Sequence, residues 1–200
     1  MTSVKCTVIG ELAGKTALIQ VFTQEQFPTD FTPTVFGMDS RTLELDNEEI
    51  LVNIWDTSCQ ESFEELRKQA SKGSDVIILA FSINGYIEHI EQIWMKEIER
   101  NFPEGQSPPI VLVGTMVDLR GEERRTDDRR LTTYKDGVVL AKKIGAKRYM
   151  ECSAKKDPQS CRAIFEAAVR EALKKNVTSP PTALSFSCFK TVSSQLDDQR

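Results

Sequence analysis

Apolar runs alternate with amphipathic stretches along most of the chain, and this alternation restricts the fold more than any other feature. The apolar runs have the composition of strands covered on both faces, and they occupy residues 4–9, 75–81 and 109–114. Stretches with helical spacing separate them, at residues 15–22, 87–98 and 137–144. Such alternation predicts an α/β fold with a mostly parallel sheet and right-handed crossovers.

The remaining segments fit the same scheme. An acidic turn at residues 46–49 lies between two apolar segments and predicts a hairpin. We expect a charged helix at 62–70, a short strand at 148–152 and a last helix carrying Ile164 to Ala172. The hydrophobic period fades after residue 175, which predicts one domain over residues 1–175 and a flexible tail over 176–200. The charged stretch 120–130 is either a solvated segment or a partner-binding insert.

Composition excludes several classes of protein. A net charge of −4 and an isoelectric point near 5.3 argue against nucleic-acid binding. No apolar run approaches the ~20 residues that span a bilayer, and the first residues have no signal-peptide pattern. The five cysteines form no CxxC pair, so neither a zinc site nor a disulfide framework is indicated. We therefore expect reduced thiols and a cytoplasmic location.

The segment GELAGKT at residues 10–16 stands between the first strand and the first helix, where α/β sheets bind phosphate. Its consecutive backbone N–H groups and the helix N-terminus form a concave anion site. Lys15 is expected to reach the terminal phosphates, and Thr16 to give its hydroxyl to Mg²⁺. The expected phosphate-binding residues are Gly10, Glu11, Leu12, Ala13, Gly14, Lys15, Thr16 and Ala17.

This loop is one residue shorter than the common pattern G-x-x-x-x-G-K-[ST]. Either one residue is deleted, or Ile9 takes the first glycine position. We favour the deletion, because Gly10 follows the strand in the expected way. Loss of one charge-assisted hydrogen bond would weaken phosphate binding about ten- to a hundredfold.

Four later segments occur in a fixed order along the chain. They are PTVF at 33–36, WDTSCQE at 55–61, GTMVDL at 114–119 and ECSAK at 151–155. With the phosphate loop they resemble the small GTPases of the Ras superfamily over residues 3–175. Lys5-Cys6, Phe27-Pro28, Trp55 and the charged stretch after Asp118 resemble the Rho family in particular. The resemblance implies a P-loop NTPase G domain, with a six-stranded, mostly parallel sheet and helices on both faces.

The resemblance also implies a molecular switch. GTP, GDP and Mg²⁺ would be its ligands, and exchange factors, GTPase-activating proteins and effectors its partners. Thr16, Thr34 and Asp56 would hold Mg²⁺, and the loop of Thr34 would be released on hydrolysis. Gln60 would orient the attacking water.

The guanine base would bind at the other end of the site. Asp118 would accept two hydrogen bonds from guanine and reject adenine, which cannot supply them. The Ala154 N–H would meet the guanine carbonyl, and Phe27 would lie against the base. The expected base-side residues are Phe27, Thr115, Asp118, Leu119, Ser153, Ala154 and Lys155.

Several residues depart from the pattern of the Rho family. Leu12 and Cys59 replace glycines beside the terminal phosphate, Met116 replaces a lysine beside the base, and Phe31 replaces a tyrosine. Residues 37–39 differ from the usual effector sequence, so no partner can be carried over. We expect retained guanine-nucleotide binding, weakened affinity and slow or absent hydrolysis.

The C-terminal tail has no cysteine four residues from its end, so we expect no prenylation. Lipidation of Cys188 with peripheral membrane recruitment is an alternative. For function, one alternative is a pseudo-GTPase that serves as a protein-interaction module. Another is a different P-loop enzyme such as a nucleotide kinase, which the guanine-reading segments disfavour. The single histidine, His89, is expected to be a surface residue.

Overall fold

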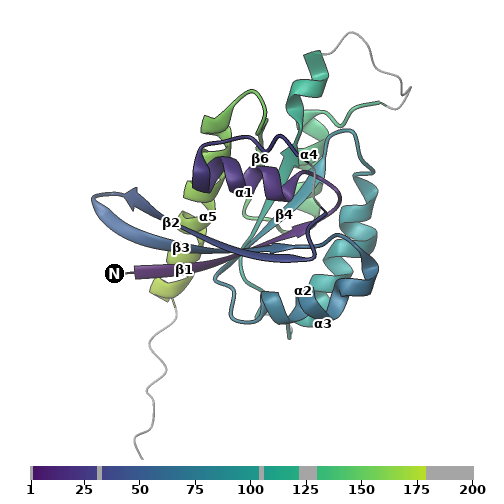
Figure 1. Ribbon diagram of the computed structural model, residues 1–200. Helices are drawn as coiled ribbons and strands as arrows, with labels where there is room; N and C mark the ends of the chain where they lie inside the picture. Colours follow the sequence, from purple (N-terminus) through teal and green to yellow (C-terminus); the bar gives the residue numbers. More distant parts are fainter. Residues whose placement is uncertain (1, 31–32, 104–105, 122–129, 179–200) are drawn as a thin grey trace, which may run out of the picture.

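The computed structural model describes residues 2–30, 33–103, 106–121 and 130–178, and it contains a six-stranded sheet of order β2-β3-β1-β4-β5-β6 (Figure 1). The strands are β1 (Thr2–Gly10), β2 (Phe36–Leu45), β3 (Glu48–Thr57), β4 (Val76–Ser82), β5 (Ile110–Thr115) and β6 (Arg148–Glu151). Only the β2–β3 hairpin is antiparallel; the other neighbours run parallel. The predicted α/β fold with its hairpin is confirmed.

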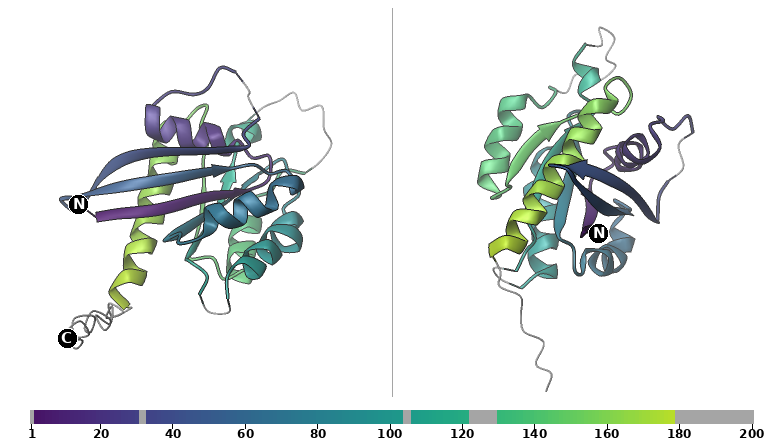
Figure 2. Two further views of the ribbon diagram at one scale, coloured as in Figure 1. Left: turned by 60° about the horizontal axis from the view of Figure 1, so that its bottom comes forward. Right: turned by 90° about the vertical axis from the view of Figure 1, so that its left-hand side faces the viewer.

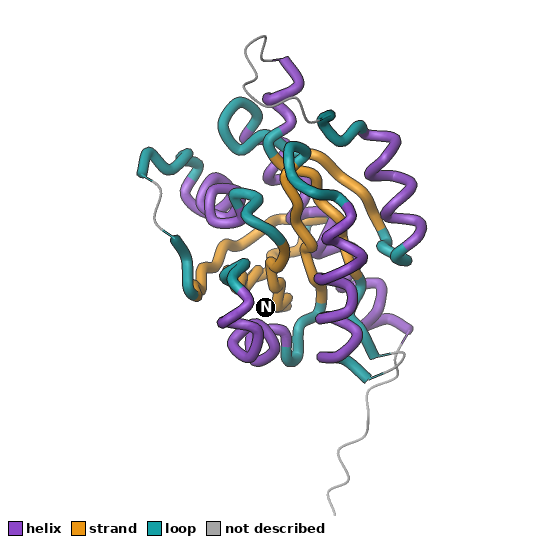
Figure 3. Tube along the Cα trace, turned by 90° about the vertical axis from the view of Figure 1, so that its right-hand side faces the viewer, coloured by secondary structure: helices purple, strands orange, loops and turns teal. Residues whose placement is uncertain are grey.

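Helices cover both faces of this sheet (Figure 2). The α-helices are α1 (Lys15–Gln24), α2 (Glu64–Ser71), α3 (Lys96–Asn101), α4 (Tyr134–Lys143) and α5 (Pro158–Thr178). Shorter helical segments are η1 (Glu61–Phe63), η2 (Ile90–Met95) and η3 (Val117–Gly121). Figure 3 colours helices, strands and loops apart in a further view.

A hydrophobic core lies on each face of the sheet, and the two cores meet at β4, which is buried along its whole length. Val76 and Ile78 face the core that α1 and α5 cover, whereas Ile77, Leu79 and Phe81 face the core below η2, α3 and α4. This double burial explains why β4 has no polar alternation. In the first core the rings of α1 and α5 stack, with the Phe22 and Phe165 centroids 4.1 Å apart.

Two helical predictions differ in detail from the structure. The single helix expected at 87–98 contains a π-helical turn, η2, before α3 begins. Glu97 is buried there along with Trp94 and Ile98, because it pairs with Arg67 of α2. The charged helix expected at 62–70 starts as a 3-10 turn and becomes α2 only at Glu64.

Some expectations fall on parts of the chain outside the described residues. These are Phe31, most of the charged stretch 120–130, and Cys188 with the rest of 179–200. Helix α5 itself runs to Thr178, a little past residue 175. Among the described helices, none has the length and apolar character to cross a bilayer.

Candidate functional site

The loop from β1 to α1 begins at a glycine that no other residue could replace without strain. Gly10 has φ of +127°, and a Cβ built there would lie 2.0 Å from the Ala80 carbonyl oxygen. The next residue, Glu11, donates its N–H to that same oxygen at 3.1 Å. Gly14 then caps α1 in a left-handed conformation, with φ of 64°. Gly10 therefore ends the strand and starts a short loop, which agrees with the interpretation that one residue is deleted.

Lys15 lies inside this loop, with 6% of its surface exposed. Its Nζ donates to the carbonyl oxygens of Gly10 at 2.9 Å and Glu11 at 2.6 Å. Burial lowers the pKa of Lys15, while the neighbouring Cys59 and Asp56 oppose that shift. An ammonium group has three donors, so two carbonyls do not exhaust it. The short loop thus encloses a cation suited to a phosphate.

The three residues expected to hold Mg²⁺ come together beside Lys15. The Thr16 hydroxyl lies 2.7 Å from that of Thr34 and donates to Asp56 Oδ2 at 2.5 Å. The other carboxylate oxygen, Asp56 Oδ1, is buried without a partner, and burial raises the pKa of Asp56. An orphaned carboxylate oxygen next to two hydroxyls fits the oxygen ligands that Mg²⁺ prefers. Thr16, Thr34 and Asp56 therefore form the candidate cation site.

Gln60 is held in place through its backbone rather than its side chain. Arg67 donates to the carbonyl oxygens of Ser58 at 3.0 Å and Gln60 at 2.5 Å. Arg67 also forms a double hydrogen bond with Glu97, at 2.8 Å for each pair of atoms, and both side chains are buried. Its guanidinium lies 5.2 Å from the centre of the Trp94 ring. This cluster fixes the segment after β3 against η2 and α3.

The base side is built from the ends of β5 and β6. Ser153 Oγ donates to Asp118 Oδ1 at 2.6 Å and accepts the Lys156 N–H at 3.0 Å. The Val117 N–H donates to the Cys152 carbonyl at 3.2 Å, and Thr115 Oγ1 donates to the Phe81 carbonyl at 3.1 Å. The bond from Ser153 orients the Asp118 carboxylate, and the other two hold the chain around it.

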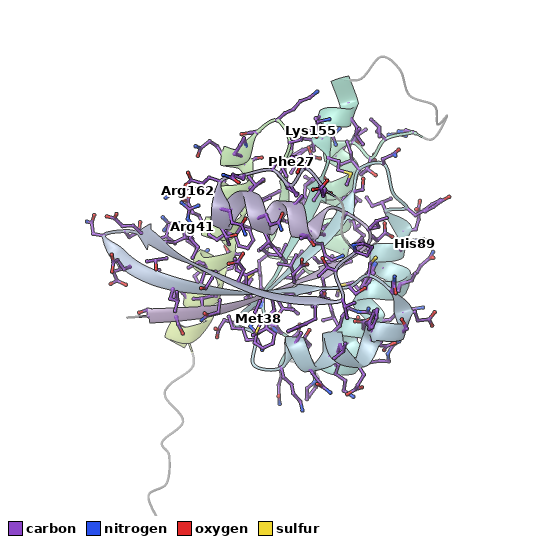
Figure 4. The ribbon with its side chains drawn as sticks, viewed as in Figure 1. Phe27, Met38, Arg41, His89, Lys155 and Arg162 are labelled. Atoms are coloured by element: carbon purple, nitrogen blue, oxygen red, sulfur yellow. The ribbon has the colours of Figure 1, made fainter. Side chains whose placement is uncertain are left out.

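Two adjoining hollows join these groups. One, of about 410 Å³, is lined by the phosphate loop with Thr34 and Gln60; the other, of about 320 Å³, is lined by Phe27, Thr115, Asp118, Leu119, Ala154 and Lys155. Ala13, Gly14 and Ala17 line both. Figure 4 labels Phe27 and Lys155 at the same end of the molecule, beyond α1. Another hollow, of about 960 Å³, lies between α3 and α5 and is lined by none of the expected site residues.

A family model described as the Ras family matches residues 5–174. The chain belongs to the Ras family. Members of this family are small GTPases that bind GTP or GDP with Mg²⁺, hydrolyse GTP, and act with exchange factors, activating proteins and effectors. The expected P-loop G domain is therefore confirmed. In this Ras-family chain, the expected phosphate, metal and base residues line the two adjoining hollows or contact one another.

Met116 stands beside the base hollow in an unusual backbone conformation, with φ of +61°. Its Sδ accepts a hydrogen bond from Ser82 Oγ at 3.4 Å. Its methyl carbon lies 3.3 Å from where a Cβ of Gly14 would stand. The methionine therefore packs over the phosphate loop, which is the contact that an apolar replacement of lysine can keep.

Two contacts of this Ras-family site were not expected from the sequence. His89, expected at the surface, lies with Nδ1 2.8 Å from Glu11 Oε1, and 40% of its side chain is exposed. The Arg67–Glu97 pair was also missed. The available signals were Glu11 inside the phosphate loop and Glu97 among the apolar positions of a helix, but neither signal predicts which residue it contacts.

Proposed function

We propose that this chain is a Rho-type molecular switch that binds GTP and GDP with Mg²⁺, recruits effectors in its GTP form and hydrolyses GTP slowly. The observation that carries the proposal is the contact of Thr34 with Thr16 and the orphaned oxygen of Asp56 beside them. Thr34 belongs to the segment between α1 and β2, whereas Thr16 belongs to the phosphate loop. One cation can therefore tie Thr34 to the nucleotide.

Each group has a defined role in this proposal. Lys15 binds the terminal phosphates, together with the amides of residues 12–16. Asp118, oriented by Ser153, accepts two hydrogen bonds from the guanine edge, and Ala154 and Phe27 complete the base site. Mg²⁺, held by Thr16, Thr34 and Asp56, would neutralise negative charge on the phosphates. Gln60 orients the attacking water from the segment that Arg67 fixes.

Slow hydrolysis follows from the residues beside the terminal phosphate. Leu12 is 67% exposed and lines the same hollow as Gln60 and Cys59. A leucine side chain there competes for the space of the water and of an arginine supplied by an activating protein. Cys59 adds a Cβ where the family has a glycine, so the backbone N–H is less free to approach the phosphate.

The Rho assignment is supported by residues that contact one another. Lys5 Nζ lies 4.1 Å from the centre of the Trp55 ring, and Trp55 meets Phe36 edge-on, with centroids 5.3 Å apart. We propose that the exposed apolar side chains nearby form the effector surface: Val35, Phe36, Met38 and Leu66. The cysteines of the described region are free, which supports a reducing compartment such as the cytoplasm.

The proposal is tested on the purified chain freed of nucleotide by a chelator. Calorimetry should show binding of GDP and GTP that weakens without Mg²⁺, and excess ATP should not compete. Exchange should be accelerated by a Rho-type rather than a Ras-type exchange factor. An absence of heat with guanine nucleotides would leave only the interaction-module alternative.

Hydrolysis is tested in single turnover. The double variant L12G/C59G should hydrolyse GTP at least about tenfold faster than the wild type, since it restores space and one donor worth about 1.5–3 kcal/mol. Equal rates in the two proteins would contradict the explanation by Leu12 and Cys59.

A further inference from the structure

Glu11 is fixed at three points, although it belongs to a loop. Its N–H donates to Ala80 on β4 at 3.1 Å, and its carbonyl accepts from Lys15 at 2.6 Å. Its carboxylate meets His89 Nδ1 at 2.8 Å, and only 14% of the side chain is exposed. Glu11 therefore links β4, the phosphate-binding lysine and the turn that precedes η2.

The place of the carboxylate is shaped by its surroundings. A Cβ built on Gly85 would stand 2.8 Å from Glu11 Oε2, so the glycine leaves the space that this oxygen occupies. The His89 ring lies against Tyr86, with centroids 5.0 Å apart. Lys15 and Glu88 are the other charged groups near Glu11. Figure 4 shows His89 on the side of the molecule where η2 and α3 lie.

The residues that follow Glu11 give the loop little other support. Leu12 is 67% exposed, so its side chain does not anchor the loop to the core. Ala13 is buried but has only a methyl group. With one residue missing, the direction of the remaining amides depends on how Glu11 is held. A change in its orientation would also move the carbonyl that Lys15 contacts.

We infer that His89 is a positioning residue for phosphate binding: by holding Glu11, it keeps the shortened loop and Lys15 in the geometry that receives the terminal phosphates. The inference rests on the proposed nucleotide binding and adds a residue outside the loop. His89 itself touches no nucleotide atom in this scheme. Its effect should therefore be confined to ligands whose phosphates reach the loop.

The test compares GDP with GMP, because GMP lacks the terminal phosphate. H89A should increase the dissociation rate of fluorescent GDP about threefold to tenfold, the effect of a partly exposed charge-assisted hydrogen bond. GMP affinity should stay within about twofold of the wild type, by the same reasoning. H89N keeps an N–H donor near the position of Nδ1 and should restore most of the GDP retention. E91A, which breaks the exposed pair of Glu91 in η2 with Lys143 of α4, is the matched control and should change the binding of neither nucleotide.

Each remaining outcome is decisive. In an E11A background, H89A should have no further effect on GDP, since its partner is gone. The inference would be overturned if H89A weakened the binding of GDP and GMP equally. It would also be overturned if H89A weakened GDP binding as much in the E11A background as in the wild type. If the wild type retains GDP and H89A does so equally well, the inference alone fails. If the wild type binds no GDP at all, the proposed function fails and the inference falls with it.

Discussion

The base side and the phosphate side of the site are held in place by different kinds of contact. On the base side, Asp118 is oriented by Ser153, and Val117 is bonded to Cys152, so neighbouring strand ends support each other. On the phosphate side, the supports reach across from the turn before η2 and from α3, through the pairs His89–Glu11 and Glu97–Arg67. The first kind of support follows from the sheet itself, whereas the second depends on particular side chains.

This difference runs parallel to the departures from the family pattern. Asp118, Ser153 and Ala154, which we propose to read guanine, keep the family pattern where the support is main-chain geometry and short local bonds, and Met116 is the one departure noted there. The loop deletion, Leu12 and Cys59 occur where side chains of other helices provide the support. A site of this kind can keep its choice of base while its phosphate chemistry changes.

The largest effect is expected at the buried Arg67–Glu97 pair on the phosphate side. E97A leaves the Arg67 guanidinium buried without its partner, which should lower the free energy of unfolding by about 3–5 kcal/mol. Urea denaturation measures this change. R100A, which removes the exposed pair with Glu64, is the control and should show no measurable change. A loss for E97A no larger than that for R100A would mean that the phosphate side does not depend on this pair.

The base side should respond through ligand binding rather than folding. D118A removes both hydrogen bonds to the guanine edge and should lower GDP affinity at least about a hundredfold, since bonds to a charged group contribute about 1.5–3 kcal/mol each. Unlike H89A, it should weaken GMP by a similar factor, because the base is common to both ligands. Calorimetry with the two nucleotides measures the comparison. If D118A weakened GDP and GMP by clearly different factors, the division of the site into two sides would be wrong.

The fold was predictable from short-range sequence patterns, and the same patterns predicted a set of site residues that the structure brings close together. The apolar run at 75–81 is typical of a central strand, and the structure has β4 there. The order of the motifs along the chain placed them at one edge of a parallel sheet. The place of Gly10 at the junction of strand and loop followed from its position at the end of the first apolar run. These features need only periodicity and chain order.

The supports between elements were not predictable from the sequence. Glu97 looks like any acidic residue of an amphipathic helix, and its burial depends on Arg67, which lies thirty residues earlier in the chain. His89 looked like a surface residue because its partner belongs to a loop far away in sequence. Such pairs depend on how the helices pack on the sheet, and this packing cannot be predicted from the residue pattern of a single sequence.

The smallest expected effect concerns Met116, which lies where the two sides meet. It lines the base hollow and also packs over Gly14 of the phosphate loop. M116K keeps a similar unbranched stem and adds a positive charge near the phosphates, while losing the contact of sulfur with Ser82 Oγ. An added charge at a partly exposed site contributes up to about 1 kcal/mol, so GDP affinity should rise about twofold to fivefold at low salt.

The salt dependence separates the charge from the packing. The gain of M116K should shrink as ionic strength rises, because exposed charges are screened over about 10 Å at 0.1 M salt. M116L is the matched control, and its GDP affinity should stay within about twofold of the wild type, as for other volume-conserving replacements. If both variants lost affinity equally, the bond between Met116 and Ser82 would be what holds the loop after β5. The boundary between the two sides would then belong to the base side, since that bond joins the ends of β4 and β5.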